Sequence, residues 1–154
     1  MTRAPLIFIH GAGETADVWR EQHEAFGDAH FLTLPGHSTG GSASTIDEFV
    51  AYVDSYRTHV GVPVTLVANS MGAAVALTYA LAHPQAVRSA VLIGCGPQLR
   101  VADALLAQLR SDFPRASKAI ASYSFSKNAA PHLAQWAENE MLRIGQAQTL
   151  RDFL

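Results

Sequence analysis

Short apolar runs alternate with longer amphipathic stretches through the first two thirds of the chain. The runs cover residues 5–9, 30–34, 64–68 and 90–93. Runs of this length are typical of buried strands, and the stretches that follow the first three runs have the spacing or composition of helices. Strands that alternate with helices predict parallel strands joined by right-handed crossovers. The expected fold is an α/β three-layer sandwich on a parallel sheet of about four strands.

The pattern changes near residue 97, because only helical signals follow it. Apolar residues recur at helical spacing, as in Leu105, Leu106, Leu109, Ile120, Leu133, Trp136, Met141, Leu142 and Ile144. We therefore predict a sheet-containing core over residues 1–97 and a helical segment over residues 98–154. The stripe of leucines with Trp136 is interpreted as packing of these helices over the sheet, and not as a cofactor site.

The clearest start of a helix lies before residue 46. Thr45 precedes Glu48 by three residues, which is the spacing of a capping box. Phe49 and Val53 then follow at helical spacing. A helix is therefore predicted from residue 46 onward.

Composition and charge narrow the possible functions. The 154 residues are 49% hydrophobic and 16% charged, which is a globular composition. The net charge is −2 and no lysine or arginine cluster occurs, which argues against binding to nucleic acid or an anionic membrane. The expected partner is a small-molecule substrate. Cys95 is the single cysteine, and the apolar run at 5–9 is too short for a signal peptide or a membrane span. We therefore expect a cytoplasmic protein.

The third apolar run leads into a serine between small residues. The sequence from residue 64 is Val-Thr-Leu-Val-Ala-Asn-Ser-Met-Gly, and an alanine-rich stretch follows at once. This layout predicts a tight strand-to-helix turn that lifts the Oγ of Ser70 clear of the sheet. A serine at the start of a helix is often only an N-cap. The interpretation of Ser70 as a nucleophile therefore depends on other motifs in the chain.

Three further motifs occur in order with this serine. They are His10-Gly11-Ala12-Gly13 with Trp19 nearby, Leu34-Pro35-Gly36-His37-Ser38, and Val91-Leu92-Ile93-Gly94. Together the four motifs resemble the α/β-hydrolase superfamily over residues 5 to about 97. Ala68 and Ser38 stand where that family usually has glycine. The remainder of the chain resembles the beginning of the family's helical cap.

The resemblance implies a role for each motif. Ser70 would be the nucleophile of acyl chemistry on an ester, thioester or amide, because the branches that open epoxides or displace halide use aspartate there. The backbone N–H groups of Ala12 and Met71 would form the oxyanion hole. His10, Gly11 and Gly72 would support the two turns, and His10 is not assigned as the base. Apolar helices in the cap favour a hydrophobic substrate.

Other reactive side chains are expected to have structural roles. His37 is interpreted as a loop histidine bonded to nearby backbone, and Cys95 as a small buried residue at a strand end. The remaining candidates are expected to be solvated or capping groups, and they are His23, His30, His59 and His83. No residues have metal-ligand spacing, so neither a metal nor a cofactor is expected.

The acid and the histidine base that the family places after the nucleophile are not assigned here. Downstream of Ser70 the acidic candidates are Asp103, Asp112, Glu138, Glu140 and Asp152, all in or beside predicted helices. Beyond the helix that follows Ser70, the one histidine is His132, which follows a proline at the start of a helix, and not a strand. A triad needs a base positioned by the sheet, so the chain is expected to be the N-terminal portion of a larger hydrolase.

The fourth run is uniformly apolar, as a strand buried between two others would be. As an edge strand it would expose unpaired backbone groups without a charge or proline to protect them. We therefore expect that further sequence, a completing chain or a second copy of this chain adds to this edge. Two alternatives stay open: a homologue that binds a ligand without turning it over, and a structural half that exchanges strands with a partner.

Overall fold

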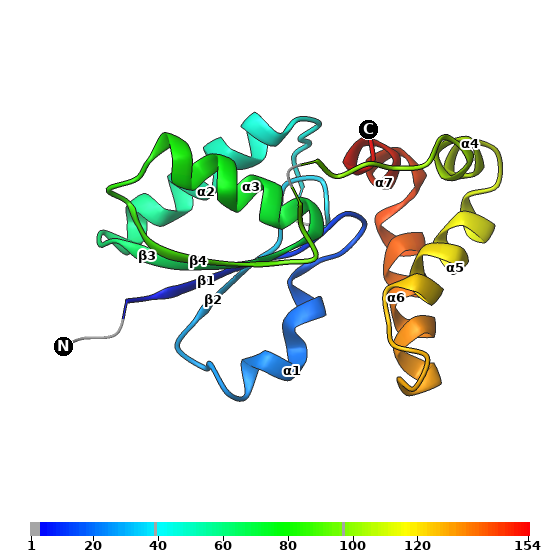
Figure 1. The fold of residues 1–154 in the computed structure, drawn as a ribbon, viewed down its shortest axis with the longest axis horizontal. Coiled ribbons are helices and arrows are strands. Elements are labelled where there is room, and N and C mark those ends of the chain that lie inside the picture. The colour runs from blue at the N-terminus through cyan, green and yellow to red at the C-terminus, as the bar shows by residue number, and fades with distance from the viewer. Residues whose placement is uncertain (1–3, 39, 97) are drawn as a thin grey trace.

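A computed structural model of the chain describes residues 4–38, 40–96 and 98–154. Its centre is a four-stranded parallel sheet with the strand order β2-β1-β3-β4 (Figure 1). The strands are β1 (Leu6–Ile9), β2 (His30–Leu32), β3 (Val64–Asn69) and β4 (Val87–Ile93). The predicted parallel α/β fold is confirmed.

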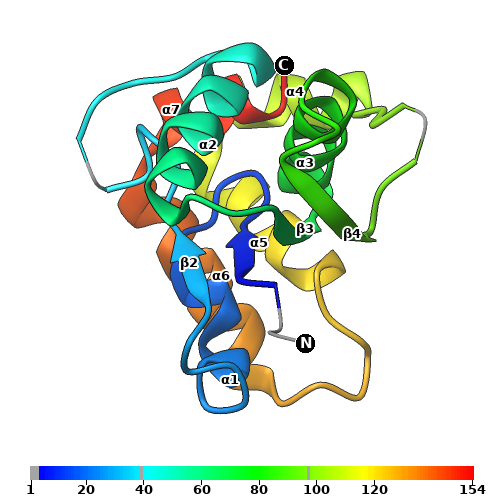
Figure 2. The ribbon, with the colours of Figure 1, turned by 90° about the vertical axis from the view of Figure 1, so that its left-hand side faces the viewer.

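Helices cover both faces of the sheet. The long helices α2 (Ile46–Val60) and α3 (Ser70–Ala82) lie on one face, and α1 (Arg20–His23) lies on the opposite side (Figure 2). The sequence predicts a helix over about residues 17–26 after the first apolar run. The observed helix is shorter, because a 3-10 turn, η1 (Ala16–Trp19), occupies the first part of this stretch. The three-layer arrangement is therefore present, although the layer beneath the sheet is thin.

Alternation along β1 sends side chains into two separate cores, since successive strand residues point to opposite faces. Ile7 and Ile9 belong to the main core cluster, with Leu66 and Val75. Phe8 belongs to the other face, where its ring centroid lies 5.1 Å from that of Trp19. These two cores fix the sheet between its helical layers and position the loops that follow the strands.

The predicted capping box is present at the start of α2. The Thr45 Oγ1 accepts a hydrogen bond from the Glu48 N–H, and the Glu48 carboxylate accepts one from the Thr45 N–H. The helix ends at Gly61, whose φ of 77° lies in the left-handed region that glycine adopts without strain. The sequence signals of α2 therefore match its observed bounds.

Four helices follow the sheet. They are α4 (Asp103–Ser111), α5 (Phe113–Tyr123), α6 (Pro131–Ile144) and α7 (Gln146–Asp152). They gather at one end of the sheet (Figure 1), where α5 packs on both α4 and α6. The described residues of 98–154 contain no strand, as predicted. The division of the chain into core and cap stays a prediction. None of the helices in the described part of the chain is long and apolar enough to cross a membrane.

The edge strand β4 is uncovered, as expected if something adds to it, and the residue after it corrects an expectation from the sequence. Val91 is 49% exposed and Ile93 is 46% exposed, so this apolar strand is not buried within the described residues. The physical reason is its position, because β4 pairs with β3 alone among the described strands. Cys95, which follows β4, is exposed and not buried, since the chain leaves the sheet there without a covering layer.

Candidate active site

Ser70 lies at the junction between β3 and α3, where the sequence predicts the turn. Its φ is 49°, a left-handed conformation that is uncommon for a residue with a side chain. Strain of this kind is typical of functional sites, where the surrounding structure holds it in place. The side chain is half-buried, so Ser70 is accessible at the end of the strand.

Gly72 allows the turn to pack closely against β1. A Cβ atom on Gly72 would collide with the backbone oxygen of His10 and would lie 2.7 Å from that of Ile9. Both neighbours are backbone atoms and cannot rotate away. The close approach of α3 to the end of β1 therefore requires glycine, as the predicted supporting role implies.

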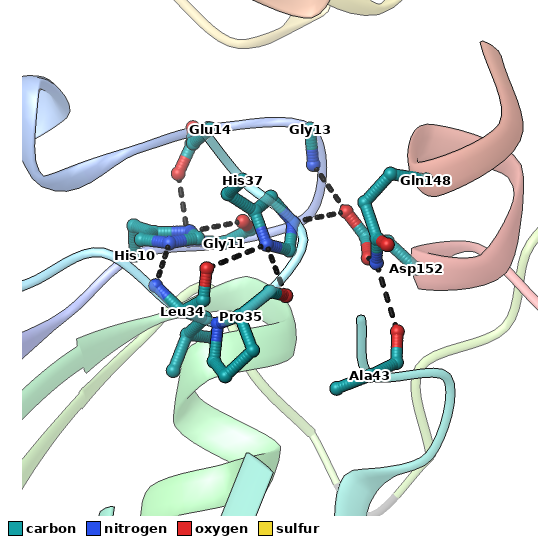
Figure 3. Close-up of polar contacts among 10 residues, drawn as sticks. All are labelled: His10, Gly11, Gly13, Glu14, Leu34, Pro35, His37, Ala43, Gln148 and Asp152. Carbon is teal, nitrogen blue, oxygen red and sulfur yellow. Dashed lines mark hydrogen bonds and ion pairs between the residues drawn. The ribbon is translucent and has the colours of Figure 1, made fainter. Parts of the chain in front are cut away.

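The turn after β1 lies directly beside Ser70. A Cβ atom on Gly11 would lie 3.2 Å from the Cβ of Ser70. The Gly11 N–H donates to the Glu14 Oε2 at 2.7 Å, and the Gly13 N–H donates to the Asp152 Oδ2 at 2.8 Å (Figure 3). Ala12 lies between these two glycines. Within the described part of the chain its N–H makes no hydrogen bond.

Met71 supplies the other predicted donor. It is the second residue of α3, and the N–H groups in the first turn of a helix have no partner within that helix. The helix dipole also favours negative charge at this end. The structure brings Ala12, Ser70 and Met71 to the wall of one cavity at the carboxyl end of the sheet. Their catalytic roles stay predictions.

His10 is a buried structural residue of this site. Its Nε2 accepts a hydrogen bond from the Leu34 N–H at 2.9 Å, so its Nδ1 carries the proton and donates to the Gly11 oxygen at 2.8 Å. Burial, with a smaller contribution from nearby His37, lowers the pKa of His10 from 6.5 to about 3. The ring is therefore neutral at physiological pH and links the ends of β1 and β2.

Acidification is expected to destabilise the fold through His10. The unfolded chain takes up this proton near pH 6.5 and the folded chain only near pH 3, so stability falls as the pH decreases between these values. The slope from one such group is about 1.4 kcal/mol per pH unit. The measurement is the free energy of unfolding in urea from pH 4 to 7. It should fall more steeply with decreasing pH in the wild type than in His10→Gln.

The comparison of variants is needed because Glu14 acts in the opposite direction. Burial raises the pKa of Glu14, so its contribution to stability falls as the pH rises above its ordinary value of 4.5. His59→Gln is the matched control, since His59 is exposed on α2. An identical pH slope in the wild type and His10→Gln would contradict the prediction.

His37 is a loop histidine that contacts nearby backbone, as predicted, and it also contacts Asp152, which was not expected. The ring is fully buried, and its Nδ1 lies 3.3 Å from the Leu34 oxygen and 3.2 Å from the Pro35 oxygen. Its Nε2 lies 2.7 Å from the Oδ2 of Asp152 in α7. Asp152 therefore contacts the loop after β2 as well as the turn after β1.

Glu14 and Asn69 form a second contact that sequence reasoning missed. The Glu14 Oε2 accepts from the Asn69 Nδ2 at 3.2 Å as well as from the Gly11 N–H. The Oδ1 of Asn69 is buried and has no hydrogen-bond partner among the described residues. Glu14 thus ties the turn after β1 to the residue before Ser70. Glu14 lies in a polar turn, and nothing in the local sequence predicted that it would contact Asn69.

A cavity of about 700 Å³ opens beside Ser70. Its walls come from the α3 start, the segment after β4 and the end of the chain, and they include Ala12, Ser70, Met71, Leu77, Leu99 and Phe153. His132 is an exposed residue of α6 and is not part of this lining. No histidine among the described residues lines the cavity. No group of three or more His, Cys, Asp or Glu side chains in the described ranges is arranged to hold a metal ion.

The comparison with known protein families identifies the chain. A model described as the alpha/beta hydrolase family matches residues 6–152. The chain belongs to this family. Membership of the α/β-hydrolase family confirms the resemblance of the four motifs, and it extends over the helical segment that the motifs did not cover.

Curated relatives of this α/β-hydrolase chain have names of ester-cleaving enzymes. The (lyso)-N-acylphosphatidylethanolamine lipase of Bos taurus is 30% identical over 136 residues, or 78% of this chain and 38% of the lipase. The pimeloyl-[acyl-carrier protein] methyl ester esterase of Salmonella heidelberg is 32% identical over 97 residues, or 60% of this chain and 37% of the esterase. The chain therefore spans less than two fifths of either relative in these alignments.

Solved structures show the same fold at low sequence identity. An esterase from Exiguobacterium antarcticum matches with a TM-score of 0.82 at 18% identity, over 99% of this chain and 65% of the esterase. A thermophilic esterase matches with a TM-score of 0.80 at 24% identity, over 98% of this chain and 59% of that protein. The α/β-hydrolase chain thus corresponds to part of each of these structures.

Proposed function

We propose that this chain carries the nucleophile and the oxyanion hole of a serine hydrolase that acts on an ester, thioester or amide. The observation that carries the proposal is the position of Ser70. It has a positive φ between β3 and α3 and shares the wall of the cavity with Ala12, whose N–H has no hydrogen-bond partner among the described residues. A serine that served only as an N-cap would not need this conformation, because N-cap residues have extended backbone.

The reaction would begin with attack by the Ser70 Oγ on the substrate carbonyl. Negative charge then develops on the carbonyl oxygen, and the N–H groups of Ala12 and Met71 would donate to it. Donors held in place beforehand are effective, and the loss of one typically costs about 2.7–4 kcal/mol of transition-state stabilisation. The proton of Ser70 needs a base. We propose that a histidine and an acid outside residues 1–154, in further sequence or in a partner chain, supply this function.

The cavity favours a substrate with an apolar acyl or alkyl group. Leu77, Leu99 and Phe153 line it, and Thr78, Gln98 and Arg100 are among its polar residues. Apolar side chains that would contact such a group, together with polar groups that orient it, are typical of small-molecule sites. The names of the two curated relatives, a lipase and a methyl ester esterase, support the choice of an ester over an amide.

The exposed edge of β4 supports the proposal that the sheet continues beyond the described strands. Val91 and Ile93 are about half exposed on this edge, and the strand's charged residue, Arg88, lies near its other end. A strand from further sequence or from a second copy would cover them. The same addition would supply loops at the carboxyl end of the sheet, which is where the base and the acid are needed.

A fluorophosphonate probe tests the proposed nucleophile directly. In the complete gene product that contains these residues, we expect one adduct, which peptide mass spectrometry assigns to Ser70. With residues 1–154 alone, we expect labelling to be much slower, because the base would be absent. An adduct on another serine, or no adduct on the complete product, would contradict the proposal. Fast labelling of the isolated chain would show that the base lies within it.

A further inference from the structure

Two carboxylates accept the N–H groups on either side of Ala12. Glu14 takes the N–H of Gly11 from within the same turn, and Asp152 takes the N–H of Gly13 from α7 (Figure 3). The N–H between them is left without a partner among the described residues. Because both neighbouring N–H groups are bonded, the planar peptide unit that carries the Ala12 N–H has little freedom to turn without breaking one of these bonds.

We propose that Asp152 is a positioning residue for the oxyanion hole, so that the site is complete only when α7 is docked against the turn after β1. The proposal rests on the proposed function, because it assigns to the Ala12 N–H the role of oxyanion donor. Asp152 does not contact the reacting atoms. It acts through Gly13, which is the next residue after Ala12.

The Asp152 side chain is held more firmly than a surface carboxylate. It is fully buried, and its Oδ2 lies 2.8 Å from the Gly13 nitrogen and 2.7 Å from the His37 Nε2. Its Oδ1 accepts from the Gln148 Nε2 at 2.9 Å. Hydrogen bonds to a charged group are shorter and stronger than neutral ones, and a buried carboxylate needs such partners. Three donors from three segments therefore fix the position of this carboxylate.

Side chains of α6 and α7 also pack directly against the turn after β1. A Cβ atom on Gly13 would lie 2.7 Å from the Met141 Cγ and 3.3 Å from the Thr149 Cγ2, so α6 and α7 lie directly against it. The Gln148 Nε2 also donates to the Ala43 oxygen at 3.0 Å, which ties α7 to the loop before α2. A shift of α7 would therefore remove the acceptor from Gly13 and release the turn.

The residues that follow the Asp152 contact also line the cavity beside Ser70. Asp152, Phe153 and Leu154 belong to its lining, together with Ala12 and Ser70. The segment that anchors the turn is thus also part of the wall beside the substrate. An oxyanion donor acts mainly in the transition state, so a misplaced Ala12 should reduce kcat far more than it changes KM.

The test is hydrolysis of p-nitrophenyl butyrate by the complete gene product and its Asp152→Asn variant. We expect kcat to fall by about 10- to 100-fold with KM nearly unchanged, because a small misplacement at an active site has effects of this size. Glu140→Gln is the matched control. Glu140 of α6 accepts from the Thr15 hydroxyl at 3.1 Å, which is also a contact between a C-terminal helix and the segment after β1 but does not flank Ala12. Its kcat should match the wild type.

Four outcomes would overturn the inference, and one of them concerns the proposed function itself. A wild type that neither hydrolyses the ester nor labels at Ser70 overturns both. An active wild type with unchanged kcat in Asp152→Asn overturns the inference alone, as does an equal loss in Glu140→Gln. If Asp152→Asn does not fold, Gln148→Ala replaces it, since it removes one anchor of the carboxylate. A several-fold lower kcat at unchanged KM then supports the inference, and full kcat overturns it.

Discussion

Replacement of Ser70 by alanine is expected to abolish hydrolysis while leaving the fold intact. The substitution removes only the hydroxyl, and the positive φ of 49° and the packing of the turn are retained. Loss of a serine nucleophile typically reduces kcat by about 10⁶-fold, and the remaining activity comes from the oxyanion hole and from binding. We expect a loss of at least about 10³-fold in kcat with p-nitrophenyl butyrate, measured on the complete gene product.

The stability of the variant separates chemistry from folding. The urea midpoint of Ser70→Ala should lie close to that of the wild type, since the Ser70 hydroxyl makes no hydrogen bond among the described residues. Ser122→Ala is the matched control. The Ser122 hydroxyl is exposed on α5 and donates to the Ala119 oxygen at 2.7 Å, so its loss should not affect hydrolysis. Activity that persists in Ser70→Ala would show that another group is the nucleophile.

Gly72→Ala is expected to destabilise the fold by at least about 3 kcal/mol, measured as the free energy of unfolding in urea. Forced overpacking typically costs about 1–3 kcal/mol, and this site lies at the upper end because the new Cβ meets backbone oxygens of β1. The gain of about 1 kcal/mol from alanine over glycine in a helix is too small to offset the collision. A domain of this size has about 5–15 kcal/mol of total stability, so much of it would be lost.

Gly27→Ala provides the matched glycine control. A Cβ atom there would lie 3.8 Å from the His23 oxygen, which is an ordinary contact, and no positive φ demands glycine. We expect no loss of stability, or a gain of about 0.4–1 kcal/mol from the stiffer unfolded chain. If Gly72→Ala unfolded at the same urea concentration as Gly27→Ala, the close approach of α3 to β1 would not be a constraint on this fold.

Local signals in the sequence were sufficient for the elements of the core. The apolar run before Ser70 and the small residues around it predicted the strand, the turn and the helix, because all three depend on neighbours within a few residues. The capping box at Thr45 and Glu48 predicted the start of α2 for the same reason. The bounds were less accurate where the signal was weak, as in the short η1 and α1.

Burial was predicted less well than secondary structure. Cys95 was expected to be buried at a strand end, and it is exposed. The apolar run at residues 90–93 indicated a strand that needs cover, and it is exposed because β4 pairs with β3 alone among the described strands. The apolar side chains of β4 therefore indicate a strand that is covered by neighbours, and the described strands leave part of it uncovered.

The sequence by itself determined the parallel α/β fold, the helical segment after it and the turn that carries Ser70. Only the tertiary structure decided that Asp152 contacts Gly13 and His37, and that Glu14 contacts Asn69. Asp152 is separated from Gly13 by 139 residues, and no periodicity or local motif relates positions so far apart. Their contact follows from the path of the chain, which returns α7 to the carboxyl end of the sheet, where buried N–H groups need acceptors.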